Sequence, residues 1–282
     1  MTTEGKAYTE QLEALYEGFP CGRLWIKLAQ TENERQEIFR LRFRVFNDEL
    51  GEGIPENREI GMDIDPYDAF CDHLMVLSED KKKVVGTYRL LPGVSRPESG
   101  FYSETEFNLK SIPINFSEAV ELGRGCIEPE FRRQTTLMAL FWGLHRYMFA
   151  RNARYLLGCG SLPKMSNDDA EATFDLLASR GVLKENLQAY VLESHRFSGD
   201  PSLGKAQIPA LIEFYLQFGA NVLCRPAYDP VFGCFDLLML FDMDNLSEWG
   251  QDLLERFDRR LLARANRESP SGLSGFSIDS NL

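Results

Sequence analysis

A glutamate and an arginine stand three residues apart in an apolar run that is typical of a buried strand, Glu121-Leu122-Gly123-Arg124-Gly125-Cys126-Ile127. Burying an ion costs several kcal/mol unless the ion is paired or hydrogen-bonded, so both charges need an explanation. A structural ion pair between Glu121 and Arg124 would satisfy them together. Alternatively, burial would raise the pKa of the Glu121 carboxyl and suit it to act as a general base toward a nucleophile.

The two glycines in this run bear on where the charged side chains can point. Residues three apart on a regular strand project from opposite faces of a sheet, so Glu121 and Arg124 could not share a pocket there. Gly123 and Gly125 permit a bulge, which would redirect side chains and expose backbone N–H groups. We therefore predict a bulge or a splayed strand at this point, with a backbone N–H able to stabilise an oxyanion.

Other residues that could do chemistry occur upstream. Arg42 lies in a segment predicted to be a helix, Arg89 lies in a strand-like run, and a loop carries Asp65 and Asp68. Acidic residues in loops commonly form turns, and Arg89 could simply pair with one of the two aspartates. Phe46 occupies a core-facing helical position, where packing is the ordinary role.

The hydrophobic periodicity indicates a chain in which helices and strands are interspersed. Thr31-Glu32-Asn33-Glu34 has capping-box spacing at the start of a helix predicted over 32–49. Other helices are predicted over 8–17, 135–151, 168–179 and 209–218. Strands are predicted over 22–29, 73–78, 84–91, 119–127, 155–159, 188–192, 221–225 and 235–242. This order predicts an α/β (α+β) fold around a largely antiparallel sheet.

Composition excludes some function classes. The 282 residues include 31 Lys plus Arg and 43 Asp plus Glu, and the net charge of −12 argues against general nucleic-acid binding. A local group of arginines could still meet an anionic partner: Arg132, Arg133, Arg146, Arg151 and Arg154. No apolar run is long enough to span a membrane, and the N-terminus lacks signal-peptide features, so we expect a cytoplasmic protein.

Neither a metal site nor a covalent nucleophile is predicted. The six cysteines show no C-x-x-C spacing, and His73, His145 and His195 match no triad or metal spacing. Cys126 neighbours the charged pair but is best explained as a core thiol. Direct attack of one substrate on another is therefore favoured over a covalent enzyme intermediate.

A last helix, predicted from Asn245, carries a stripe of apolar residues at steps of three or four. The stripe consists of Leu246, Trp249, Leu253, Phe257 and Leu261. Docking on the body of the protein is the ordinary meaning of such a stripe, and peripheral contact with a membrane is the alternative. Residues 265–282 are rich in Ser, Gly and Asn and are expected to be disordered, which leaves a single domain over 1–264.

Three further motifs precede the Glu121 strand: Leu41-Arg42-Phe43-Arg44-Val45-Phe46, Met62-Asp63-Ile64-Asp65-Pro66-Tyr67-Asp68 and Val84-Val85-Gly86-Thr87-Tyr88-Arg89-Leu90-Leu91-Pro92. In order and spacing, the four motifs resemble the acyl-carrier-protein-dependent branch of the GNAT superfamily over about residues 35 to 240. That branch contains the acyl-homoserine-lactone autoinducer synthases and the ornithine N-acyltransferases. The stretches 71–74, 100–107 and 215–220 favour the ornithine type. Glu52, where the resemblance would expect tryptophan, disfavours the autoinducer type.

The resemblance implies a GNAT-like fold with a mostly antiparallel central sheet flanked by helices. It implies an enzyme that moves a 3-hydroxyacyl chain from acyl carrier protein to the α-amine of ornithine, giving lyso-ornithine lipid, with no permanently bound cofactor. Acyl-CoA stays open as the donor. Acylation of glycine or another amino acid, autoinducer synthesis, and a module that binds carrier protein without turnover are the alternatives.

The resemblance also implies roles for individual residues. Glu121 would be the base, directly or through water, and Arg124 would hold Glu121 or the donor in place. On the amino-substrate side, Arg42 would bind the carboxylate and Asp65 with Asp68 the side-chain ammonium. Arg89 and Phe46 belong to this side too. The donor side would use the backbone at Gly123 and Gly125 and the exposed pair Arg132 and Arg133, where GNAT acetyltransferases usually have a glycine-rich turn. Phe141, Trp142 and Leu144 could line an acyl slot.

Overall fold

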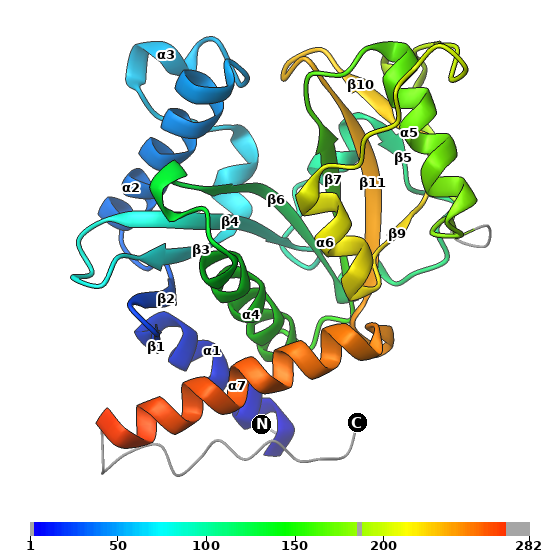
Figure 1. Cartoon of the computed structure of the whole chain (residues 1–282). Helices are drawn as coiled ribbons and strands as arrows, with labels where there is room; N and C mark the ends of the chain where they lie inside the picture. The colour runs from blue at the N-terminus through cyan, green and yellow to red at the C-terminus, as the bar shows by residue number, and fades with distance from the viewer. Residues whose placement is uncertain (1–2, 185–187, 269–282) are drawn as a thin grey trace.

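The computed structural model describes residues 3–184 and 188–268 and has a mixed sheet at its centre (Figure 1). The strand order is β1-β2-β3-β4-β6-β7-β11-β10, with β9 paired to β11. Within it, only β6 and β7 run parallel. The strands of this sheet are β1 (Phe19–Cys21), β2 (Leu24–Leu28), β3 (Asp72–Leu77), β4 (Val84–Pro92), β6 (Ala119–Ile127), β7 (Tyr155–Leu162), β9 (Asn221–Val222), β10 (Ala227–Asp229) and β11 (Cys234–Asp242). The predicted α/β fold with a mostly antiparallel sheet is confirmed.

Helices cover both faces of the sheet. On one face, α4 (Gln134–Ala150) shares a core with α1 (Thr3–Glu17), α6 (Ala210–Phe218) and α7 (Glu248–Glu268). On the other face lies α2 (Glu32–Phe43), which continues as a π-helical turn over Arg44–Leu50. Strand β3 feeds both cores: Leu74 and Val76 pack toward α4, whereas Met75 and Leu77 pack toward α2, as the two-residue period of a strand requires.

The remaining elements connect these layers. They are α3 (Asn57–Ile60), α5 (Asn167–Ser179) and a small sheet of β5 (Phe107–Asn108) with β8 (Tyr190–Val191). Short 3-10 turns occupy Pro66–Phe70, Tyr102–Thr105, Phe116–Glu118, Pro129–Phe131, Glu193–His195 and Met243–Asn245.

Strands β6 and β7 pair over only three residues and then part. Ala119, Val120 and Glu121 lie opposite Tyr155, Leu156 and Leu157, after which β6 continues along β4 and β7 along β11 (Figure 1). Gly158 follows the last paired residue of β7, and a Cβ there would lie 2.3 Å from the Leu122 carbonyl oxygen. Glu121 is therefore the last residue of β6 that pairs with β7, and it lies at the point where these two strands part.

The predicted bulge is present in β6. Between β4 and β6 the register shifts: Arg89 lies opposite Gly123, whereas Thr87 lies opposite Cys126. The left-handed residue is Arg124 itself, with a φ of 49°, and not either of its glycine neighbours. Close packing explains the glycine at position 125, because a Cβ there would lie 2.4 Å from the Tyr88 ring.

Most element boundaries agree with the sequence. The capping box at Thr31 and Glu34 is present, and Gly219 ends α6 with a φ of 106°. The strand predicted over 22–29 is instead a hairpin of β1 and β2, whose turn includes Gly22. Strand β10, between Pro226 and Pro230, was not predicted because three residues are too few to show a period.

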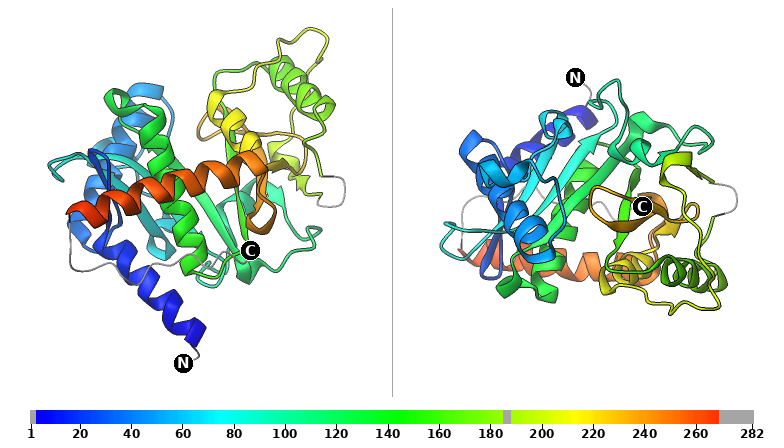
Figure 2. Two further views of the ribbon diagram at one scale, coloured as in Figure 1. Left: turned by 60° about the horizontal axis from the view of Figure 1, so that its bottom comes forward. Right: turned by 90° about the horizontal axis from the view of Figure 1, so that it is seen from above.

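Helix α7 docks on the body through its apolar stripe, as expected. Of the predicted stripe, Leu246 and Leu261 are buried in the α4 core and Leu253 and Phe257 pack against it, whereas Trp249 is 45% exposed. Leu254, which lies outside the predicted stripe, is also buried in this core. The helix runs across the molecule in Figure 2. Asp258 on the same helix is buried and accepts a 3.0 Å hydrogen bond from Trp142 Nε1. The helix extends to Glu268, past the boundary predicted at 264. The rest of the predicted tail, 269–282, lies outside the described residues.

Among the described residues, no helix combines the length and the apolarity needed to cross a membrane.

Candidate active site

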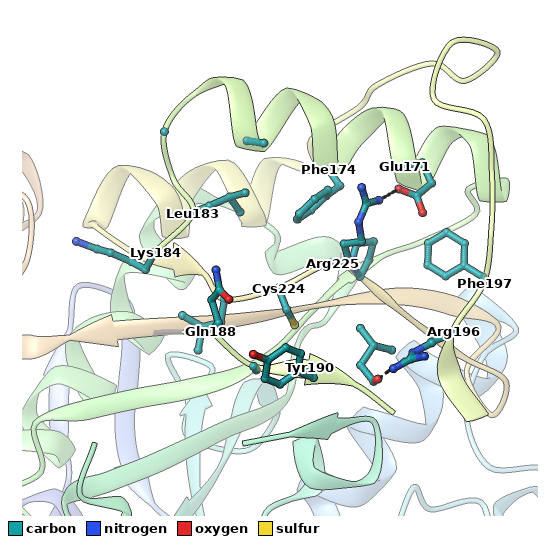
Figure 3. Close-up of a pocket in the computed structure, with 16 residues that line it drawn as sticks. Glu171, Phe174, Leu183, Lys184, Gln188, Tyr190, Arg196, Phe197, Cys224 and Arg225 are labelled. Carbon is teal, nitrogen blue, oxygen red and sulfur yellow. Dashed lines mark hydrogen bonds and ion pairs between the residues drawn. The ribbon is translucent and has the colours of Figure 1, made fainter. Parts of the chain in front are cut away.

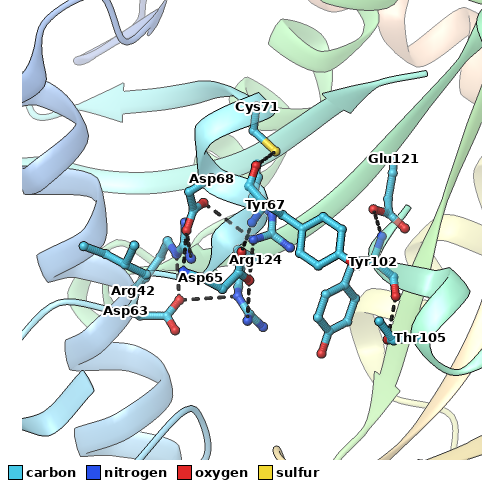
Figure 4. A network of polar contacts seen from close by, with 12 residues as sticks. Arg42, Asp63, Asp65, Tyr67, Asp68, Cys71, Tyr102, Thr105, Glu121 and Arg124 are labelled. Atoms are coloured by element: carbon cyan, nitrogen blue, oxygen red, sulfur yellow. Dashed lines mark hydrogen bonds and ion pairs between the residues drawn. The ribbon is translucent and has the colours of Figure 1, made fainter. Parts of the chain in front are cut away.

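Three arginines and three aspartates form a buried arginine–aspartate network beside the opening of the sheet (Figure 4). The members are Arg42, Arg89, Arg124, Asp63, Asp65 and Asp68. Arg42 is fully buried, and its Nε donates to Asp63 Oδ2 at 2.7 Å. Its Nη1 and Nη2 donate to the two oxygens of Asp68, at 2.7 and 3.1 Å. This bidentate geometry is the strongest arrangement of the pair.

The other two arginines converge on Asp65. Arg89 Nη1 donates to Asp65 Oδ2 at 2.6 Å, and Arg124 Nη2 donates to the same oxygen at 2.9 Å. Arg124 Nε also lies 3.4 Å from Asp63 Oδ2. The expected ion pair between Arg89 and a loop aspartate is therefore present, and the network holds as many arginines as aspartates.

The loop aspartates also form a turn, as the sequence suggested. Asp65 caps the 3-10 turn Pro66–Phe70 by accepting from Tyr67 N, and Asp68 accepts from Asp65 N, both at 2.9 Å. Burial alone would raise the pKa of Asp68, but Arg42 outweighs burial and holds that pKa well below its usual range. At Asp65, burial likewise raises the pKa, but the charges of Arg89 and Arg124 outweigh burial, so the pKa of Asp65 is lowered.

The network bears on two expected roles. Arg42 has no exposed surface and already binds two carboxylates of this chain, so it is not placed to hold the carboxylate of a substrate. Asp65 and Asp68 are neutralised by arginines, so they do not offer free charge to a substrate ammonium. Both findings have the same cause: the aspartates of the loop form ion pairs with the arginines of the neighbouring helix and strands.

Glu121 is held by donors from the turn Tyr102–Thr105. Its Oε2 accepts from Tyr102 N at 2.7 Å, and its Oε1 accepts from Ser103 N and Ser103 Oγ at 2.7 and 2.6 Å. Burial raises the pKa of Glu121 above its ordinary value, although the bonds from Ser103 and Tyr102 act in the opposite direction. A carboxylate offers about four acceptor positions, so three donors leave about one for a water or an amine.

Glu121 and Arg124 do not form the ion pair that their spacing allowed. Arg124 points to the aspartates, and its guanidinium lies 4.4 Å from the centre of the Phe232 ring and 5.4 Å from that of Tyr102. Tyr102 therefore lies between the two charges: its backbone N bonds to Glu121 and its ring faces Arg124 (Figure 4). The expectation that Arg124 holds Glu121 in place is not met by any direct contact in the structure.

A second group of acidic residues lies near Glu121 and was missed by the sequence interpretation. We call Glu106, Asp229 and Asp236 the carboxylate cluster; all three are buried. Tyr102 connects it to the base, because its hydroxyl donates to Asp229 Oδ2 at 3.4 Å. Asp236 stands in the apolar run of β11, which is the signal that identified Glu121, so the same criterion could have found it.

Comparison with known proteins bears on the fold and on the class of enzyme. Residues 41–142 match the family described as acetyltransferase (GNAT) domain. The chain is GNAT-like in fold and an acyltransferase.

Two curated relatives are L-ornithine N(alpha)-acyltransferases. The one from Rhizobium meliloti (strain 1021) is 29% identical over 242 residues, 78% of this chain and 80% of that protein. The one from Agrobacterium fabrum (strain C58) is 28% identical over 243 residues, 80% of this chain and 83% of that protein. A solved CoA-dependent acyl-homoserine lactone synthase, with SAM and isopentyl-CoA, shares the fold at 14% identity and a TM-score of 0.50, over 86% of this chain and 90% of that one. The resemblance to the ornithine acyltransferases is thereby confirmed.

The two arginines expected on the donor side differ in their surroundings. Arg132 is engaged, because its Nη1 and Nη2 bind the two oxygens of Glu49 at 2.5 and 2.6 Å. Arg133 is exposed and stands at the N-cap position of α4, whose first turn has no side-chain cap. An uncapped helix N-terminus with a cation beside it suits an anion such as a phosphate.

The proximity of the following arginines in the sequence suggested that they join Arg132 and Arg133 in one basic patch. The structure shows no such patch. Arg151 pairs with Asp72 at 2.6 Å, and Arg154 pairs with Asp242 at 2.8 Å. Arg146 lies 3.4 Å from Asp258. Helix α4 separates these three arginines from Arg132 and Arg133, and each of the three has an acidic partner. The N-terminal end of α4 is therefore the part of this segment that stays a candidate for binding an anionic partner.

The expected acyl slot on α4 is filled by the core. Phe141 packs on Phe218 with ring centres 4.1 Å apart, and Trp142 and Leu144 are buried. Phe46, expected on the amino-substrate side, is half-buried and packs edge-on against Phe232, with ring centres 6.3 Å apart. Phe46 therefore belongs to the same aromatic contact that covers Arg124.

A cavity of about 700 Å³ lies instead between α5, β8 and the segment 223–226 (Figure 3). Its walls are mostly apolar and include Phe174, Leu183, Val191, Phe197 and Leu223, with Glu171 paired to Arg225 at its edge. This volume is within the range of small-molecule sites, and the apolar walls suit an alkyl chain.

Cys126 and His73 are buried and His145 is partly buried, which is consistent with the structural roles expected for them. Burial raises the pKa of Cys126 to about 12 and lowers the pKa of His73 and of His145 to about 4. At neutral pH the thiol is protonated and both imidazoles are uncharged.

Proposed function

We propose that this protein transfers an acyl chain from a thioester to the α-amine of ornithine. The similarity to curated L-ornithine N(alpha)-acyltransferases over about four-fifths of each chain carries the proposal. A buried carboxylate with a raised pKa, at the point where β6 and β7 part, supports it.

The chemistry is aminolysis of a thioester. The amine of a free amino acid is mostly protonated near neutral pH, so a base must remove a proton before or during attack on the carbonyl carbon. Glu121 takes that proton, directly or through a water, at the acceptor position that its three donors leave free. The C–N bond forms, the oxyanion collapses, the C–S bond breaks and the thiolate leaves. A backbone N–H of the bulge at Arg124 and Gly125 stabilises the oxyanion.

The arginine–aspartate network positions this bulge. Arg124 takes a left-handed conformation and is tied to Asp65, while Arg89 from the neighbouring strand is tied to the same carboxylate. Arg42 forms ion pairs with Asp63 and with Asp68. We therefore treat Arg42, Asp65, Asp68 and Arg89 as positioning residues. Arg124 Nε is buried and makes no hydrogen bond among the described residues, so it is the donor of the network that we assign to a substrate carboxylate.

We further propose acyl carrier protein as the donor, with its phosphopantetheine phosphate at the N-terminus of α4. The turn before α4, Arg132-Arg133-Gln134-Thr135-Thr136, has no glycine, so the backbone has less freedom to approach a pyrophosphate closely than in a glycine-rich turn. A single phosphate and an acidic carrier surface need only the exposed Arg133 and the first N–H groups of the helix.

Reversing the charge at Arg133 is expected to weaken binding of the carrier protein. In Arg133→Glu, KM for acyl carrier protein should rise several-fold, because a favourable contact becomes repulsive, while turnover of a short acyl-pantetheine thioester should be unchanged. Arg259→Glu makes the same charge change at an exposed position on α7 and serves as the control. Equal losses on both donors would contradict the docking role.

A panel of amino acids tests the proposed acceptor. Purified protein with 3-hydroxyacyl carrier protein should give N-acyl-ornithine by mass spectrometry, and little product with glycine, lysine or S-adenosylmethionine. Acyl-homoserine lactone as the main product would assign the protein to autoinducer synthesis. Binding of carrier protein without turnover of any acceptor would indicate a module that lacks catalysis.

A further inference from the structure

Among the described residues, the three carboxyl groups of the carboxylate cluster form no ion pair with a lysine or an arginine. An oxygen of Glu106, one of Asp236 and the Cys159 sulfur lie within 4.8 Å of one another, and Asp229, Asp236 and Cys234 form an overlapping group at the same spacing. Burial, with the nearby Asp236 and Asp229, raises the pKa of Glu106 to about 9.

Glu106 is the member that points to a missing partner. Its side chain is 1% exposed, and neither carboxylate oxygen has a hydrogen-bond partner among the described residues. A buried polar group that lacks a partner is costly, and native proteins keep few of them. Asp229 is different, because one of its oxygens accepts from Val231 N and Phe232 N at 2.7 and 3.1 Å.

The cations near the cluster are committed elsewhere or exposed. Arg124 already binds Asp65 and lies 3.4 Å from Asp63 in the arginine–aspartate network. Lys164 is exposed on a turn. The same neighbourhood also contains Glu52, whose pKa burial raises. The arginine–aspartate network thus pairs each aspartate with an arginine, whereas no lysine or arginine of the described residues pairs with the cluster.

The chemistry of the cluster fits an organic ammonium better than a metal ion. The two sulfur atoms belong to thiols that burial keeps protonated, because it raises the pKa of Cys159 and of Cys234, and a protonated thiol is a poor ligand. A primary ammonium carries three N–H donors and no acceptor, which matches three carboxylates.

We propose that Glu106, Asp229 and Asp236 bind the side-chain ammonium of the acceptor amino acid and so select a basic substrate. This inference rests on the proposed function. Tyr102 gives the spacing, because its backbone N bonds to Glu121 and its hydroxyl to Asp229. The base and the cluster are therefore separated by the length of Tyr102 from its backbone N to its hydroxyl, which is comparable to the length of an extended basic amino acid. The α-amine can then lie near Glu121 while the terminal ammonium enters the cluster.

Norvaline tests the proposal, because it has the carbon chain of ornithine without the terminal amine. The wild-type protein should use ornithine in strong preference to norvaline, measured as kcat/KM. In Glu106→Gln and in Asp236→Asn, KM for ornithine should rise by about 10- to 100-fold, because each change removes one charged hydrogen bond. Activity with norvaline should change little. Calorimetric titration of ornithine into the protein without acyl donor should show the same loss of affinity.

Stability separates this role from a structural one. Neutralising a buried carboxyl that lacks a partner should leave the melting temperature unchanged or raise it, whereas a structural residue would lower it. Glu118→Gln, at an exposed position three residues before Glu121, is the matched control and should change neither affinity nor stability.

Several results would overturn the assignment. One is that the wild type acylates ornithine but both variants keep its preference over norvaline. Another is that a divalent metal copurifies with the wild type and is lost from Glu106→Gln. If instead the wild type acylates none of the amino acids in the panel, the proposed function itself fails.

Discussion

Glu121→Gln should lower kcat by about 100-fold or more, because general base catalysis typically contributes that much and an amide cannot take the proton. The amide keeps one oxygen for Ser103, but its nitrogen faces the N–H of Tyr102, so a stability loss of about 1–3 kcal/mol is also expected. Single-turnover rates with a pre-bound acyl donor would measure the chemical step, and thermal unfolding would measure the stability cost separately.

The pH dependence identifies the base. Because the pKa of Glu121 is raised, the carboxylate becomes protonated as pH falls toward that pKa, and kcat/KM of the wild type should fall with it. In Glu121→Gln this acidic limb should be absent. Ser103→Ala is the control, since it removes one hydrogen bond and keeps the carboxylate. If Ser103→Ala loses as much activity as Glu121→Gln, the carboxylate serves to order the turn Tyr102–Thr105 and is not the base.

Arg42→Ala should lower the free energy of unfolding by about 3–5 kcal/mol, because it leaves Asp63 and Asp68 buried without their partner. Such a loss is a large part of the ~5–15 kcal/mol that stabilises most domains. Urea unfolding would show it as a lower midpoint at an unchanged slope.

Arg44 provides the comparison for this change. It lies two residues later and pairs with Glu128 at 2.8 Å, but its side chain is 42% exposed. Exposed pairs contribute about 0–1 kcal/mol, so Arg44→Ala should have a small effect. Equal midpoints for the two variants would mean that the arginine–aspartate network does not stabilise the fold.

Acid should weaken the network in a defined direction. The pKa values of Asp65 and Asp68 are lowered in the folded protein, so their contribution is complete above the ordinary aspartate pKa of about 3.9 and is lost as pH falls below it. This loss should be reduced in Arg42→Ala, which has already broken part of the network.

The sequence predicted local features well and long-range partners poorly. Glu121 stands out because a charge in an apolar run is visible in the sequence itself, and the bulge follows from the spacing of its glycines. The donors to Glu121 come from 18 and 19 residues upstream through a short 3-10 turn, and no periodicity marks such a turn. Likewise, Arg42 meets Asp63 and Asp68 across 21 and 26 residues, along a loop whose path the sequence does not determine. No pattern in the sequence therefore indicated that Arg42 would be engaged in ion pairs with these two aspartates of the chain.

The absence of a side chain at Gly158 controls the separation between the two halves of the site. The bulged strand and its arginines belong to β4 and β6, whereas Asp236 and Cys159 belong to β11 and β7. Where these halves meet, a Cβ at residue 158 would lie 2.3 Å from the Leu122 carbonyl oxygen, closer than a carbon atom can approach, so any larger residue would tilt one half away from the other. The alignment of the base with the carboxylate cluster thus depends on a hydrogen atom at a residue that has no charge and takes no part in the chemistry.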